Sequence, residues 1–447
     1  MILENDLTEG KLFPKMMNFA IPYLLACFLQ TFYGLADLFI TGQFYGAAPV
    51  SAVFIGSQVM HMVIVMITGL TIGCAVSIAR SLGGRDEKNA YRLMGTSAAF
   101  FIPLSLLVSI LLLLLMPLIL SLLQTPPEAL EATADYLFIC FLGVPLIFSY
   151  NMMSSFLRGM GNTRAPMIFV ALSGIVNIGL DYLLIGPFHM SAKGAAIGTV
   201  GAEILSVLLC LFYLYHKAKI LHVRKKDFYF SKDSLRQILG IGFPICCQDG
   251  LIQVSFLAIT SIADSLGVET AAAVGIVEKI IGFLFLVPSA MMSTVSATTA
   301  QNAGAGFHER GKMGLTYGIT TCISFGFLCI LLALFKAQEI IGLFVPGEEK
   351  VIAMGSDYFH AYCFDCAIAG IHFCFSGYFS ACRKATLSFI HNVISTFAIR
   401  IPGAYLAARL FPATLFPMGL ATPAGSLLSV FICIYFYRKY FCSSKAS

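Results

Sequence analysis

Long apolar stretches recur along this chain, and short polar segments separate them. Each stretch is long enough for the ~20 residues that a helix needs to cross a bilayer. Their hydrophobic positions do not alternate as they would in the strands of a membrane β-barrel. Twelve spans can be drawn, at about 13–38, 48–78, 92–122, 134–157, 163–187, 192–215, 236–262, 270–298, 313–334, 355–381, 384–410 and 415–437. The pattern predicts an all-α polytopic membrane protein with twelve transmembrane helices.

Composition and charge distribution agree with this prediction. Of the 447 residues 58% are hydrophobic and 11% are charged, whereas a soluble protein carries about 25% charged residues. Most Lys and Arg fall in the loops of one side, and the opposite loops hold only Lys193, Lys336, Lys350 and Arg409. This asymmetry places both termini in the cytoplasm of a multi-pass plasma-membrane protein. It also explains the net charge of +5 without a nucleic-acid partner. No cleavable leader is visible, so we expect the first helix to remain in the protein.

The chain reads as two similar halves. With an offset of 222 positions, Pro22 matches Pro244 and Gly84 matches Gly306. Because each half has six spans, both halves enter the membrane from the same side, as in parallel repeats related by an axis along the membrane normal. The expected organisation is an amino-terminal six-helix lobe over 1–215, a basic cytoplasmic linker over 216–235 and a carboxy-terminal six-helix lobe over 236–447.

Two lone carboxylates stand out in the first half. Asp37 is the only charged residue between Lys15 and Arg80, and Asp181 is the only one between Arg164 and Lys193. An ionised group at membrane depth costs at least a few kcal/mol, so such residues usually bind an ion, a proton or a partner. Simple helix packing through hydrogen bonds is the alternative interpretation.

Other polar residues of this half share helix faces with these carboxylates. Asn177 lies one turn before Asp181, and Thr199 lies among small residues that permit close helix approach. Together with Asp37 they offer carboxylate, amide and hydroxyl oxygens, which suit a hard cation such as Na⁺ or a proton. Gln30 and Tyr33 lie on the face of Asp37, and Glu203 lies one turn beyond Thr199; these three are candidates for substrate contact or a secondary role.

The second half offers weaker candidates for the same kind of site. Asp249, Glu278 and Asp365 are acidic residues within its spans, with local pairing as the alternative. His360, Cys363 and Cys366 have the spacing of metal ligands, but a zinc site normally needs a fourth ligand. We therefore expect no metal beyond a coupling Na⁺ at Asp37, Asn177, Asp181 and Thr199.

No catalytic or nucleotide-binding pattern accompanies these residues. A Walker lysine motif is missing, and Gly159 and Gly161 do not follow a strand. No set of loop residues has the pattern of a nucleophile with its base. We expect a protein that is not an enzyme and that uses no cofactor apart from its coupling ion.

Several segments resemble the multidrug and toxic compound extrusion (MATE) transporter family. They are the entry segment from Leu7 to Pro22, the loop Leu82-Gly83-Gly84, the stretch Leu157-Arg158-Gly159-Met160-Gly161-Asn162-Thr163 and the stretch Asn177-Ile178-Gly179-Leu180-Asp181. Together with two six-helix halves, the resemblance covers nearly the whole length. It implies drug efflux by cation antiport, with the family's first-lobe cation site on Asp37, Asn177, Asp181 and Thr199.

At these four positions the chain has the residue types of the prokaryotic DNA-damage-inducible F-like branch, and it resembles that branch in this respect. The NorM-like branch also places acidic residues in the second lobe, and the matching positions here are Ile252 and Ala369. We therefore expect coupling in the first lobe. The expected substrates are lipophilic, often cationic compounds, and the expected partners are these substrates and membrane lipid, with the chain acting as a monomer.

Two other functions are alternatives to drug efflux. A lipid-linked oligosaccharide flippase of the same superfamily needs an Arg-rich cavity for pyrophosphate, but only Lys279 and Arg400 fall within spans. A membrane-embedded enzyme needs catalytic residues clustered at one interface, and the sequence shows none. Whether H⁺ or Na⁺ is the coupling ion stays open at this stage, because Asp, Asn and Thr serve both.

Overall fold

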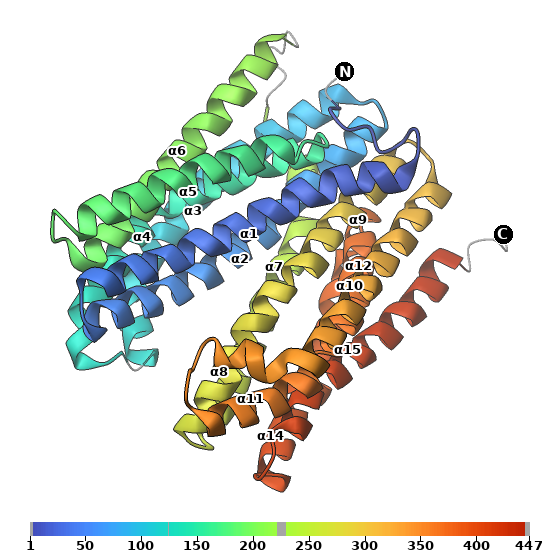
Figure 1. The fold of residues 1–447 in the computed structure, drawn as a ribbon. Helices are drawn as coiled ribbons and strands as arrows, with labels where there is room; N and C mark the ends of the chain where they lie inside the picture. The colour runs from blue at the N-terminus through green and yellow to red at the C-terminus, as the bar shows by residue number, and fades with distance from the viewer. Residues whose placement is uncertain (1–2, 124, 221–228, 443–447) are drawn as a thin grey trace. The chain divides into compact units, whose positions relative to one another are not determined.

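The structure is a computed structural model, and it describes residues 3–123, 125–220 and 229–442 (Figure 1). Its described part is helical, and no strand occurs there. The amino-terminal half holds α1 (Leu12–Phe44), α2 (Ala47–Gly83), α3 (Glu87–Leu122), α4 (Pro127–Gly159), α5 (Arg164–Ile185) and α6 (Ser191–Ile220). The predicted all-α fold of membrane-spanning helices is confirmed.

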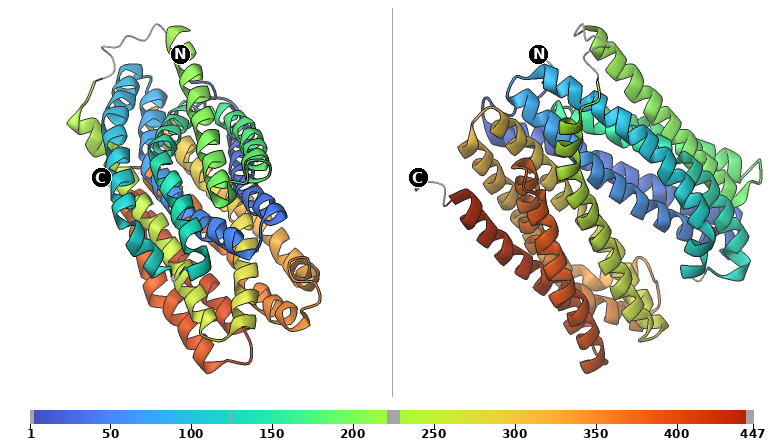
Figure 2. Two further views of the ribbon diagram at one scale, coloured as in Figure 1. Left: turned by 90° about the vertical axis from the view of Figure 1, so that its left-hand side faces the viewer. Right: turned by 180° about the vertical axis from the view of Figure 1, so that it is seen from behind.

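The carboxy-terminal half repeats this order with more interruptions. Its elements are α7 (Lys232–Asp264), α8 (Val268–Leu284), α9 (Leu286–Gly304), α10 (His308–Gly342), α11 (Glu349–Tyr362), α12 (Asp365–Ala381), α13 (Ala385–Ser395), the π-turn η2 (Thr396–Arg400), α14 (Ile401–Leu410), α15 (Phe416–Tyr437) and the π-turn η3 (Arg438–Cys442). Helix α12 packs against α10 and against α15. Figure 2 gives two further views of these carboxy-terminal helices, which are coloured from yellow to red.

Three spans expected as single helices are interrupted. The span 270–298 divides between α8 and α9 around Phe285, and 355–381 divides between α11 and α12 at Cys363 and Phe364. The span 384–410 contains the π-turn η2, which ends at Arg400. Hydropathy detects a long apolar segment, but it does not detect an interruption of the helix within that segment. When α8 and α9 are taken together, ten helical segments of the described chain, rather than twelve, are by themselves long and apolar enough to span a membrane.

The chain forms two compact units, and their limits do not coincide with the two halves of the sequence. The first unit contains residues 1–6 and 21–242, and the second contains 7–20 and 243–447. A boundary between the two units therefore falls inside α1 and another falls inside α7, and these two boundaries are 222 residues apart. Each change lies just before a helix-interior proline, Pro22 in α1 and Pro244 in α7.

The expected linker over 216–235 overlaps the end of α6 and the start of α7. Helix α6 continues to Ile220 and α7 begins at Lys232, while residues 221–228 lie outside the described residues. Thr96 of α3 accepts a hydrogen bond from the Ser231 amide at 3.1 Å. This contact fixes the start of α7 within the first unit.

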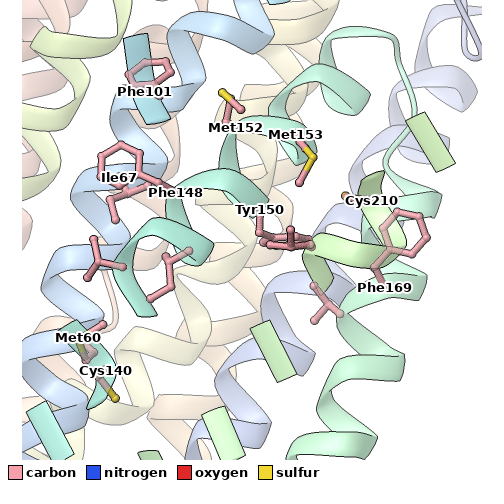
Figure 3. Close-up of a cluster of buried hydrophobic side chains, with 14 of the residues drawn as sticks. Met60, Ile67, Phe101, Cys140, Phe148, Tyr150, Met152, Met153, Phe169 and Cys210 are labelled. Carbon is pink, nitrogen blue, oxygen red and sulfur yellow. The ribbon is translucent and has the colours of Figure 1, made fainter. Parts of the chain in front are cut away.

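A large apolar core holds the first unit together. Helix α4 packs against α2, α3 and α6, and α5 packs against α6. Figure 3 shows part of this core, where Phe101 of α3 lies near Phe148 of α4 and Tyr150 lies toward Cys210 and Phe169. Many residues on the outer faces of these helices are exposed large hydrophobics, as a lipid-facing surface requires.

Candidate functional site

The first unit brings four of the predicted residues together from three helices. Asp37 comes from α1, Asn177 and Asp181 from α5, and Thr199 from α6. The Thr199 hydroxyl lies 3.2 Å from Asp37 Oδ2. Asp37 also lies within interaction range of Asp181 and Asn177. Residues far apart in the sequence therefore form one polar cluster, which we call the carboxylate-pair site.

The carboxylate-pair site is buried, and several of its polar atoms lack hydrogen-bond partners within the described residues. Asp37 is 4% exposed, and Asn177 and Asp181 are fully buried. Within the described residues, five of its side-chain atoms have no hydrogen-bond partner: Asp37 Oδ1, Asn177 Oδ1 and Nδ2, and Asp181 Oδ1 and Oδ2. Each buried polar atom without a partner costs about 1–3 kcal/mol, and more when the group is charged. A bound proton, water or cation would remove this cost.

The Thr199 hydroxyl has two acceptors but only one proton. Besides Asp37 Oδ2, it lies 3.0 Å from the carbonyl oxygen of Ala195. If its proton goes to the Ala195 carbonyl, the hydroxyl oxygen is left as an acceptor facing Asp37. A protonated Asp37 can then donate to it, or a cation can bind between the two oxygens. The arrangement therefore suits either ion.

Gly198 provides the space in which Asp181 lies. A Cβ atom added at this position would clash with Asp181 Oδ1. The glycine thus lets α6 approach α5 so closely that the carboxylate lies against the helix backbone. This close approach brings Asp181 and the neighbouring Thr199 to the same place.

The charges of the site favour the addition of one positive charge. Two carboxylates at close range in a low-dielectric interior repel each other, so full ionisation of both is unfavourable. The donor set of carboxylate, amide and hydroxyl oxygens also fits Na⁺, which prefers oxygen ligands. In the described part of the chain, no group of three or more His, Cys, Asp or Glu side chains is placed to hold a metal ion.

The other first-unit candidates form a second layer beside this site. Tyr33 of α1 interacts with the Gln30 side chain and lies within electrostatic range of both Asp37 and Glu203. Glu203 is 8% exposed, and its Oε2 has no hydrogen-bond partner in the described residues. Tyr33 is therefore within electrostatic range of the carboxylate-pair site and of a third buried carboxylate.

The second unit places its acidic candidates differently. Glu278 accepts a hydrogen bond from Thr260 at 2.9 Å. Asp365 is fully buried and lies within electrostatic range of Arg400, which donates to Ser426 at 3.0 Å. Asp249 is half-buried on α7. In the described part of the chain, these three residues do not form a group that is placed to hold a metal ion.

Two residues of these sites are not among the site candidates predicted from the sequence. Arg400 is noted there only as a cation within a span, although it is the only charged residue between Lys384 and Arg409 and meets the criterion that selects Asp37. The small residues around Thr199 predict close helix approach, but they do not distinguish Gly198, because a glycine in an apolar helix is common in membrane proteins. The position of Asp181 in the structure shows the role of Gly198.

The polar cluster inside the helices of the first unit is consistent with an ion-coupled membrane transporter, and a family model decides the family. The model described as MatE matches residues 22–183 and 244–406. The chain belongs to the MatE family. The two matched segments start 222 residues apart, so the family model also reflects the repeat of the MatE fold in this chain.

Curated relatives span the same length as this MatE chain. It is 26% identical over 437 residues to the "Probable multidrug resistance protein YpnP" of Bacillus subtilis (strain 168), covering 97% of this chain and 96% of that protein. It is 24% identical to the "Multidrug export protein MepA" of Staphylococcus haemolyticus (strain JCSC1435), covering 98% and 97%. One is named as a probable multidrug resistance protein and the other as a multidrug export protein, and neither name is that of an enzyme, in agreement with the expectation for this chain.

Solved structures show the same MatE fold. One is described as an outward-facing conformation of a multidrug resistance MATE family transporter of the MOP superfamily; it superposes with a TM-score of 0.91 at 20% identity, covering 99% of this chain and 98% of that chain. Another, described as MATE in the straight conformation, has a TM-score of 0.91 at 20% identity and covers 99% of each chain. The twelve-span, two-lobe fold class is thereby confirmed.

Proposed function

We propose that this chain is a secondary multidrug exporter, which moves lipophilic and often cationic compounds out of the cell in exchange for H⁺ or Na⁺. The observation that carries the proposal is the carboxylate-pair site, where Asp37 and Asp181 lie buried together without sufficient partners. The names of the relatives support multidrug export. They do not favour the alternative of a lipid-linked oligosaccharide flippase.

In the proposed cycle, the incoming ion binds between Asp37 and Asp181 and reduces their mutual repulsion. The part of α1 beyond Pro22 then rearranges, since proline leaves a backbone carbonyl without its helical partner and weakens the helix there. Each inward elementary charge supplies about 2.3 kcal/mol per 100 mV of membrane potential. One ion exchanged for one neutral compound thus supports a tens-fold gradient of that compound.

The proposal includes the finer expectations from the sequence. The four residue types Asp37, Asn177, Asp181 and Thr199 support a place in the branch of the DNA-damage-inducible F proteins. The Lys and Arg distribution supports a plasma-membrane location with both termini in the cytoplasm. We further propose that the protein acts as a monomer and needs no cofactor other than its coupling ion.

Efflux from proteoliposomes tests the proposal. Purified protein is reconstituted, loaded with ethidium, and given an inward H⁺ gradient or an inward Na⁺ gradient in separate preparations. We expect one gradient to drive ethidium export and the other to have little effect. Export that neither gradient accelerates over protein-free liposomes would rule out ion-coupled antiport.

Asp37→Asn gives a sharper test of the coupling residue. We expect the substitution to abolish gradient-driven ethidium efflux, because the amide cannot bind a proton or neutralise a cation, while the protein still folds and inserts. Asp135→Asn is the matched control, since Asp135 is partly exposed and pairs with the exposed Lys193, and such surface pairs contribute at most ~1 kcal/mol. Wild-type efflux by Asp37→Asn in the same vesicles would refute the assignment.

A further inference from the structure

A basic and aromatic cluster lies where α13 begins and α15 ends, and the proposed transport cycle does not use it. Lys384 precedes α13, while Lys439 and Tyr440 belong to the π-turn η3 that follows α15 (red in Figure 1). Lys384 Nζ lies 4.9 Å from the centroid of the Tyr440 ring, and Lys439 Nζ lies 5.5 Å from the same centroid. The two ammonium groups are therefore at most 10.4 Å apart, the sum of these two distances. We call these three residues, together with Tyr435, the lysine–tyrosine cluster.

The protein does not compensate the positive charge of this cluster. Lys384 and Lys439 are exposed, and within the described residues neither pairs with a carboxylate. A tyrosine ring attracts an ammonium group through its face, so it positions the charge without neutralising it. Arg383 and Arg438, the exposed sequence neighbours of the two lysines, add further positive charge. The start of α13 has no side-chain cap, so the positive end of its helix dipole also lies at Lys384. The cluster is therefore suited to an anionic group.

An exposed apolar stripe on α15 leads to this cluster. Leu427, Phe431 and Tyr435 follow one another at a spacing of four residues, and they are 44%, 61% and 57% exposed. Other faces of α15 pack against α11, α12, α13 and α14, so the stripe is a surface that is left to contact lipid. Lys439 continues the stripe, since its Nζ lies 5.6 Å from the centroid of the Tyr435 ring. A molecule whose apolar chain lies along this stripe therefore has its head at the ammonium groups.

We propose that the lysine–tyrosine cluster binds the phosphate of an anionic phospholipid, and that an acyl chain of this lipid lies along the stripe from Leu427 to Tyr435. Lysines next to a membrane-spanning helix attract anionic headgroups. Tyrosine is favoured at the membrane interface, because its ring is apolar and its hydroxyl is polar. A soluble phosphate would contact the lysines alone and would leave the stripe without a role. The proposed location of both termini in the cytoplasm places this lipid in the inner leaflet, and the inference does not otherwise depend on the export function.

Lipid binding to the intact, delipidated protein in detergent tests this site. The probes are dioleoyl phosphatidylglycerol and dioleoyl phosphatidylcholine, which have the same acyl chains and differ in net charge. Native mass spectrometry measures the binding of each lipid to wild type and to the double variant Lys384→Gln/Lys439→Gln. Lys336→Gln/Lys350→Gln is the matched control, because it removes the same charge at exposed lysines of α10 and α11. Lys384→Arg/Lys439→Arg keeps the charge and separates its loss from a change in folding.

We expect wild type to prefer phosphatidylglycerol over phosphatidylcholine by about fivefold or more, the equivalent of ~1 kcal/mol from one lysine near the headgroup. Lys384→Gln/Lys439→Gln should lose this preference and still bind phosphatidylcholine like wild type. The arginine variant and the control should keep the preference, and a large excess of inorganic phosphate should not displace phosphatidylglycerol.

Three results would overturn the site. They are a wild type that shows no preference, a Lys384→Gln/Lys439→Gln variant that keeps the wild-type preference, and a control variant that loses it equally. Displacement of phosphatidylglycerol by inorganic phosphate would likewise overturn the lipid assignment in favour of a soluble anion. All of these outcomes leave ion-coupled export standing, because ethidium efflux under imposed gradients is measured separately.

Discussion

At the scale of single residues, the position of a side chain relative to its neighbours decides the chemistry. Asp37 and Asp181 are unusual because they are buried without sufficient partners, and the close approach of α5 and α6 is what brings Asp181 into the site. That approach depends on the absence of a side chain at Gly198. A residue that carries no functional group therefore controls the geometry of two that do.

Gly198→Ala tests this dependence. The added methyl group would clash with Asp181 Oδ1, and overpacking of this kind costs about 1–3 kcal/mol. We expect ion-driven ethidium efflux to fall about tenfold, the rate equivalent of ~1.4 kcal/mol, with the protein still folded by size-exclusion chromatography. Gly179→Ala on α5 is the control, since no atom lies within 4 Å of the added Cβ there. Equal efflux by the two variants would contradict the steric role of Gly198.

At the scale of helices, contact between backbones holds the start of α7 in the first unit. A Cβ atom added at Gly73 of α2 would clash with the carbonyl oxygen of Ile238, and one added at Gly242 of α7 would clash with that of Leu70. Helix association in lipid depends on such packing of small residues, because lipid provides no hydrophobic driving force between helices. The lack of side chains at these two glycines therefore allows α7 to pack closely against α2.

Gly242→Ala and Gly240→Ala are a matched pair on one helix. We expect Gly242→Ala to lower the thermal stability of the detergent-solubilised protein, by on the order of 1–3 kcal/mol. Gly240→Ala meets no atom within 4 Å and gains up to about 1 kcal/mol of helix propensity, so it should be neutral or stabilising. Thermal unfolding curves of the two variants measure the difference. A destabilised Gly240→Ala beside an unaffected Gly242→Ala would reverse this assignment.

At the scale of the whole molecule, each half of the chain contributes a segment to the other half's unit. Residues 7–20 belong to the second unit, where Leu7 and Phe19 are fully buried. The Leu7 amide donates to Gln301 Oε1 at 2.9 Å, and Arg310 donates to the carbonyl oxygens of Leu7, Glu9 and Gly10 at 3.0, 2.8 and 2.8 Å. The second unit is thus incomplete without the amino-terminal segment.

Co-expression of two separate fragments tests this exchange. We expect fragments 1–220 and 229–447 to copurify, because 7–20 completes the second unit and the start of α7 completes the first. Deletion of 7–20 from the first fragment should abolish copurification or leave the second fragment aggregated. Arg310→Ala in the intact chain should lower thermal stability more than Lys312→Ala, which removes an exposed pair with Glu309. A second fragment that is folded and stable without residues 7–20 would contradict the exchange of segments between the two units.

The sequence by itself determined the class of fold and the two lone carboxylates. These follow from local properties: an apolar length sets a span, and a charged residue within that length is conspicuous whatever surrounds it. The same criterion applied to Arg400 would have added it to the candidates. The repeat also follows from the sequence alone, because residues of the two halves match at a constant offset of 222 positions.

The tertiary structure alone decided which residues meet and where helices break. The contact of Thr199 with Asp37, the space at Gly198 and the exchange of 7–20 between units join positions from different helices. Hydrophobic periodicity contains no information on such pairing, because any apolar helix face can pack against several others. Glu203 Oε2 has no hydrogen-bond partner in the described part of the chain, and this too depends on all the elements around the side chain and not on its own segment.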